Sequence, residues 1–68
     1  MKVRLNGDPA ELRAEATVAD AVEASGLEAA TRGVAVAVDG EVVPRGAWTE
    51  RRLSEGESVE VVRAVQGG

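Results

Sequence analysis

The segment from Val34 to Trp48, VAVAVDGEVVPRGAW, predicts much of the fold. Its first five residues form a continuous apolar run, which is typical of a central strand that is covered on at least one face. Asp39-Gly40 follows at once, and Asp-Gly favours a two-residue hairpin turn because both residues tolerate positive φ. The return strand is therefore expected from Glu41 to Val43, and Pro44 ends it because proline has no N–H to donate to a neighbouring strand.

The chain beyond this second hairpin predicts a crossover and one closing strand. Arg45 to Leu53 shows no regular period, so we expect an irregular connection with a short helical turn, anchored by its tryptophan and its leucine. Ser58 to Arg63 is the last predicted strand, with Val59 and Val61 facing inward. We expect this strand to lie beside the N-terminal one, so that the C-terminus leaves at one end of the sheet.

A first hairpin is predicted at the N-terminus. Met1 to Leu5 alternates between apolar and charged residues, which is the period of a half-buried strand. Asn6-Gly7 is a strong hairpin signal. The return strand is expected near Ala10 to Ala14, with Leu12 inward, and Pro9 predicts that this strand lies at the edge of the sheet.

The one predicted helix begins at Thr17. Thr17 is a good N-cap, and Asp20 three residues later has the spacing of a capping box. Gly26 can take the left-handed conformation that ends a helix. The segment from Glu28 to Gly33 is interpreted as a loop. The residues expected on the buried face of the helix, at i, i+3 and i+4, are Val18, Ala21 and Val22.

Together these elements predict an α+β roll, a mixed sheet of four to five strands with one main helix packed across one face. The length of 68 residues suits a single domain. We place that domain at residues 1–64 and expect residues 65–68 to be a flexible C-terminal tail.

The composition excludes several classes of function. There is no His and no Cys, so a His-activated serine, a thiolate nucleophile and most zinc sites are excluded, and we expect no metal and no bound cofactor. A net charge of -4 disfavours binding to nucleic acid. No apolar run approaches the roughly 20 residues that span a bilayer. With no cysteine and no signal-peptide pattern at the N-terminus, we expect a cytoplasmic protein without membrane contact.

The end of the chain is the strongest candidate for a working group. It stops at Gly67-Gly68, a few residues after the last predicted strand. Most chain ends are simply mobile. Two residues without Cβ, however, can thread a narrow cleft that a side chain would block, and so present an unhindered carboxylate. We therefore expect Gly68 to be the reacting residue, with Val65, Gln66 and Gly67 as the part of the tail that threads the partner.

Two stretches resemble a known family. The V-P-R-x-x-W run at Val43, Pro44, Arg45 and Trp48 is similar to the ThiS-type sulfur carriers of thiamine biosynthesis. The closing segment from Leu53 to Gly68 resembles the same family, and the likeness extends over essentially the whole chain. The Gly-Gly end is common to all ubiquitin-like carriers, whereas the V-P-R-x-x-W run favours the thiamine branch.

The resemblance implies a ubiquitin-like β-grasp fold and a protein co-substrate rather than an enzyme. An E1-like adenylyltransferase would use Mg-ATP to adenylate the Gly68 carboxylate. A sulfur donor (a desulfurase or its relay) would convert it to a thiocarboxylate, and thiazole synthase would receive the sulfur. Alternatives are a carrier of another pathway, such as the molybdopterin synthase small subunit, tRNA thiolation or cysteine synthesis. A non-activated ubiquitin-like interaction module is the alternative from another class.

A candidate docking surface follows from strand parity. If the valines of the Val34–Val38 strand face the helix, Ala35 and Ala37 face outward, and the same parity places Val62 outward. Small exposed apolar residues would make a flat docking patch, although an Ala-rich composition explains the alanines equally well. Arg45 is assigned either to a salt bridge or to an interface contact with a partner. Trp48 is interpreted as an anchor of the crossover, with a partner contact as the alternative.

Overall fold

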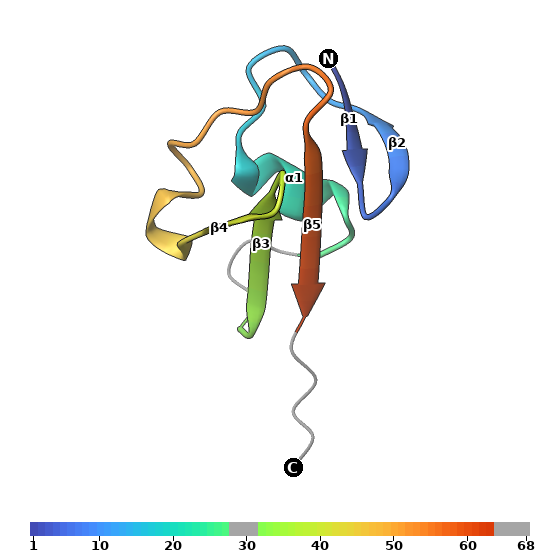
Figure 1. Cartoon of the computed structure of the whole chain (residues 1–68). Helices are drawn as coiled ribbons and strands as arrows, with labels where there is room; N and C mark the ends of the chain where they lie inside the picture. Colours follow the sequence, from blue (N-terminus) through green and yellow to red (C-terminus); the bar gives the residue numbers. More distant parts are fainter. Residues whose placement is uncertain (28–31, 64–68) are drawn as a thin grey trace.

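The strands of the computed structural model form one mixed sheet, and the structure describes residues 1–27 and 32–63. Within these residues the sheet order is β2-β1-β5-β3-β4, with β1 and β5 parallel and the other neighbours antiparallel. The helix α1 crosses one face of the sheet (Figure 1). This is the α+β roll that the sequence predicts. The elements are β1 (Lys2–Leu5), β2 (Asp8–Glu11), α1 (Val18–Ala24), β3 (Val34–Val38), β4 (Glu41–Val43), the 3-10 turn η1 (Arg45–Ala47) and β5 (Ser58–Arg63).

The core lies between the helix and the sheet and consists mainly of valine. Alternation along β3 and β5 points one set of their side chains at α1, and no charged or polar residue of the described chain is buried. Each fully buried valine contributes roughly 1.5–3 kcal/mol relative to an exposed one. The largest fully buried side chains, those with less than 2% of their area exposed, are Val18, Val22, Val36, Val38 and Val59.

The capping box at the start of α1 is present. The Thr17 N–H donates to Asp20 Oδ2 at 2.8 Å, and the Asp20 N–H donates in return to Thr17 Oγ1 at 3.4 Å. Arg13 donates to the same carboxylate oxygen at 2.9 Å. The hydrogen bond from the Thr17 backbone, together with the Arg13 guanidinium, holds the pKa of Asp20 below its ordinary value of 3.8.

Side chains from both hairpin turns also form hydrogen bonds with the central strand of the sheet, β5. Asn6 and Asp39 have φ values of 52° and 49°, as the Asn-Gly and Asp-Gly signals predict. Their side chains reach across to β5, where Asn6 Oδ1 accepts the Val61 N–H at 2.8 Å and Asp39 Oδ1 accepts the Ser58 N–H at 2.9 Å. Because the two turns stand on opposite sides of β5, that strand is held from both sides.

One boundary differs from the prediction. The return strand of the first hairpin is Asp8–Glu11 and not Ala10 to Ala14, so that prediction was wrong by two to three residues. The return strand begins directly after the two-residue turn, because Leu5 already pairs with Asp8. Pro9 therefore lies inside β2, and β2 is an edge strand, as Pro9 predicts.

Two further predicted features, the end of the helix and the anchors of the crossover, are confirmed. Gly26 has a φ of 96° after α1, and Trp48 and Leu53 anchor the crossover with 3% and 5% of their area exposed. The predicted loop from Glu28 to Gly33 lies mostly outside the described residues. In the described part of the chain, no helix combines the length and the apolar character that a membrane crossing needs.

Candidate functional site

The central strand leads to the C-terminal residues. β5 lies between β1 and β3 and ends at Arg63, five residues before Gly68. Its C-terminal end lies at the end of the molecule opposite the N-terminus (Figure 1). The predicted site residues Val65, Gln66, Gly67 and Gly68 all lie outside the described residues. The structure therefore describes the strand that leads to the candidate site, whereas the reacting residue itself is predicted from the sequence alone.

Three of the four predicted docking residues share the face of the sheet that α1 does not cover. Ala35 and Val62 are direct cross-strand partners, and both are exposed. Ala37 is the next residue of β3 that faces outward. It is half-buried and pairs with Glu60 on β5. Strand parity thus places these side chains as predicted, next to the strand that carries the tail.

Sequence reasoning missed one member of this surface. Val42 on β4 is the most exposed large apolar side chain of the described residues, at 74%, and Val62 follows at 59%. Val42 pairs with Ala37, so it extends the same face toward the edge of the sheet. The signal was available, since Val43 faces the core and its neighbour must face away. We call Ala35, Ala37, Val42 and Val62 the apolar patch.

Arg45 lies in a different place. It follows β4, and its guanidinium lies over the Trp48 ring, 4.5 Å from the ring centroid. The Trp48 Nε1–H donates to the Val43 carbonyl at 2.9 Å, and the indole belongs to the core on the helix side. The V-P-R-x-x-W run is therefore a structural unit, in which Pro44 ends the strand and the arginine covers the tryptophan.

Two further observations on the described residues concern metal binding and a surface hollow. Within residues 1–27 and 32–63, no group of three or more acidic side chains is arranged to hold a metal ion. An open hollow of about 340 Å³ separates the first hairpin from the end of α1. Its lining holds one ionisable side chain, Asp8, so nothing there pairs an acid with a base. The hollow is lined by Leu5, Asn6, Asp8, Pro9, Ala10, Ala24 and Ser25.

Known proteins resemble this chain in sequence and in fold. The ThiS family matches residues 3–68. A crystal structure of the thiamine biosynthesis protein (ThiS) from Geobacter metallireducens superposes with a TM-score of 0.78 at 27% identity, over 100% of both chains. The solution structure of a thiamine biosynthesis protein from the same organism gives 0.74 at 25% identity, over 100% of this chain and 88% of that one.

A third solved structure supports the fold alone. SAMP1 from Haloferax volcanii superposes with a TM-score of 0.62 at 21% identity, over 100% of this chain and 98% of that chain. No curated protein matches this chain.

The five-stranded mixed sheet with one helix is the ubiquitin-like β-grasp fold, and its likeness to the Geobacter structures covers the whole chain. Because the family match runs from the first strand through the terminal Gly-Gly, this chain belongs to the ThiS family.

Proposed function

We propose that this protein is a sulfur carrier of thiamine biosynthesis, whose Gly68 carboxylate is adenylated and then converted to a thiocarboxylate. The observation that carries the proposal is the family match, which extends to residue 68 and so includes the Gly67-Gly68 end. The likeness to a thiamine biosynthesis protein over all of both chains supports it.

The chemistry requires an activating partner because a carboxylate is a poor electrophile. An adenylyltransferase with Mg-ATP would join the Gly68 carboxylate to the α-phosphate, forming an acyl-adenylate and releasing pyrophosphate. The terminal sulfur of a donor persulfide then attacks the acyl carbon and displaces AMP, and a second thiol of the donor attacks the resulting S–S bond, which leaves a disulfide on the donor and releases the acyl group with its sulfur. The product is a thiocarboxylate, which passes its sulfur to thiazole synthase. The carrier itself holds no catalytic group in this scheme and acts as a co-substrate.

The fold suits this role because it holds the base of the tail firmly. β5 is hydrogen-bonded to β1 and β3, and the Asn6 and Asp39 side chains secure it further. Gly68 is the fifth residue after Arg63, and five residues of fully extended chain span at most about 18 Å. The carboxylate can therefore be presented well away from the folded domain, while the domain itself rests against the partner.

We place the docking contact with the adenylyltransferase on the apolar patch. Val62 belongs to the strand that leads to the tail, six residues before Gly68. Exposed valines on a small domain leave apolar area in water that a partner can cover. A partner that encloses the tail must come close to the end of β5, where it meets Val62 and Ala35 first.

Intact-mass spectrometry tests the chemistry. Incubation with the adenylyltransferase and Mg-ATP should add one AMP to the protein, and addition of the sulfur donor should replace one carboxylate oxygen by sulfur. A variant that lacks Gly68 is the control and should acquire neither change. An adduct on an internal residue, or none on the parent protein with its own enzyme, would rule out the proposed function.

Isosteric substitution tests the docking contact. Val42→Thr and Val62→Thr together keep the β-branched shape and replace one methyl by a hydroxyl at each position. At roughly 1 kcal/mol per position, about 2 kcal/mol for the pair, KM for the carrier should rise about thirtyfold at unchanged kcat. Ala14→Ser, at an exposed turn position away from the sheet face, is the matched control. An unchanged KM for the double variant would exclude the apolar patch as the contact.

A further inference from the structure

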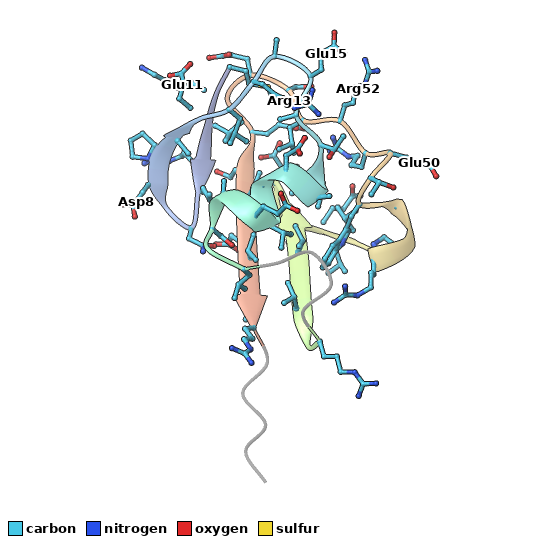
Figure 2. All side chains as sticks on the ribbon, turned by 180° about the vertical axis from the view of Figure 1, so that it is seen from behind. Asp8, Glu11, Arg13, Glu15, Glu50 and Arg52 are labelled. Carbon is cyan, nitrogen blue, oxygen red and sulfur yellow. The ribbon has the colours of Figure 1, made fainter. Side chains whose placement is uncertain are left out.

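The turn of the first hairpin contains a reactive pair of residues. Asn6 is the one asparagine of the chain, and a glycine follows it. Both residues are exposed, and the next residue, Asp8, points away from the molecule (Figure 2). A Cβ added at Gly7 would meet no other heavy atom within 4 Å, so the space beside this residue is open. An exposed Asn-Gly pair is prone to deamidation, because glycine has no side chain to hinder attack by its own nitrogen on the asparagine side chain.

The reaction proceeds through a succinimide ring. The Gly7 nitrogen attacks Cγ of Asn6, so that an N–Cγ bond forms, the Cγ–Nδ2 bond breaks and the Gly7 amide proton leaves with Nδ2 as ammonia. One water molecule then opens the ring at either carbonyl. Opening at Cγ gives aspartate. Opening at the main-chain carbonyl gives isoaspartate, in which the backbone runs through Cβ and Cγ and is one methylene longer.

The native turn keeps the two reacting atoms apart. Asn6 and Gly7 have φ values of 52° and 87°, which match a type I′ turn, whose first central residue has a ψ of about +30°. At this ψ the Gly7 nitrogen lies nearly opposite Cβ across the Cα–C bond, whereas ring formation requires both on the same side. Asn6 is also fixed by hydrogen bonds, because its Oδ1 accepts the Val61 N–H at 2.8 Å and its N–H donates to the Val59 carbonyl at 2.9 Å.

We propose that Asn6 is a deamidation site which the native hairpin protects, and that its isoaspartyl product breaks the connection between this hairpin and β5. The ring forms only after the turn has opened, so the rate in the folded protein is the rate of the unfolded chain multiplied by the small fraction of open molecules. The loss of ammonia makes the step irreversible.

The isoaspartyl product cannot rebuild the native turn. Its additional backbone atom no longer matches the register in which Leu5 pairs with Asp8, because the length of a hairpin turn sets the pairing of its strands. Oδ1 becomes the oxygen of the peptide bond to Gly7 and leaves its place beside the Val61 N–H. The modification therefore releases a hydrogen bond from the strand that leads to the C-terminal residues.

The test incubates the parent protein, folded and in guanidinium chloride, in the same mildly alkaline buffer. Intact-mass spectrometry follows the replacement of NH2 by OH, peptide mapping separates Asn6 from Gln66, and an isoaspartyl methyltransferase quantifies isoaspartate. Asp39→Asn is the matched variant, because it places a second Asn-Gly pair in a turn with similar φ values, 49° and 85°. Asn6→Gly is the negative control.

We expect the folded parent to deamidate about tenfold or more slowly than the denatured chain, and the new pair of Asp39→Asn to be protected to a similar degree. Equal rates in the folded and the denatured protein, at either pair, would overturn the protection by the turn. The isoaspartyl form, prepared in denaturant, refolded and separated by ion exchange, should have a lower urea midpoint than Asn6→Asp, which carries the same charge on a normal backbone. Equal midpoints would overturn the loss of the connection to β5.

Discussion

Replacement of Asn6 by glycine separates two roles that this residue has in the turn. Its backbone is in the left-handed region at φ 52°, and its Oδ1 accepts the Val61 N–H at 2.8 Å. Glycine takes the same backbone conformation without strain, so the turn itself is preserved. The Asn6 N–H bond to the Val59 carbonyl is also kept. Only the acceptor for Val61 is removed.

The expected loss is about 2 kcal/mol of unfolding free energy. An N–H left without its partner costs about 1–3 kcal/mol, and the lower half of this range applies because the turn is exposed and water can reach the site. The greater freedom of glycine in the unfolded chain adds about 0.4–1 kcal/mol. A domain of 68 residues has a total stability of roughly 3–10 kcal/mol, so this loss is a large fraction of it.

Urea denaturation followed by fluorescence measures the effect, because Trp48 is the one tryptophan and is 3% exposed. With an m-value near 1 kcal/mol/M, the midpoint should fall by about 2 M. Asn6→Asp keeps both the acceptor and the tolerance of positive φ, so it should lose less than Asn6→Gly. If Asn6→Gly unfolds at the parent midpoint, the side-chain bond to β5 does not stabilise the domain and the reasoning fails.

Three further predictions concern other parts of the molecule. Because the folded pKa of Asp20 is lowered, the stability that its carboxylate contributes is complete above pH about 4 and is lost as pH falls through the folded pKa; urea midpoints between pH 6 and 2 should fall less steeply for Asp20→Asn than for the parent. Trp48→Phe leaves the Val43 carbonyl without its donor and should lower the melting temperature by roughly 5–10 °C by circular dichroism, whereas an unchanged melt would show that the hydrogen bond is dispensable. Gly67→Ala should leave stability within about 0.5 kcal/mol while acyl-adenylate formation falls at least tenfold, and activation at the parent rate would exclude the threading argument.

Most of the secondary structure follows from local signals. Asn6-Gly7 and Asp39-Gly40 produce two hairpins because each pair permits positive φ at both positions. Thr17 and Asp20 start the helix through bonds that span three residues. The boundary of β2 was predicted less well, because the sequence does not show how soon the return strand begins, and only the pairing of Leu5 with Asp8 shows that it follows the turn at once.

The candidate site also combines residues that were predicted from the sequence with one that only the structure reveals. Gly68 and its neighbours come from the sequence alone, since the described residues end at Arg63. Strand parity correctly put Ala35, Ala37 and Val62 on one face, but it does not say which strand lies beside which, and Val42 joins them only because β4 pairs with β3.

The sequence by itself thus determined the turns and the cap, because each depends on residues a few positions apart, and the proposal for Gly68 also rests on the sequence. The tertiary structure alone decided that Asn6 bonds to Val61, which is 55 positions away, and that Asp39 bonds to Ser58. A local pattern cannot specify such contacts. They exist because the buried valines bring β1 and β3 to either side of β5, and the side chains meet as a consequence of that packing.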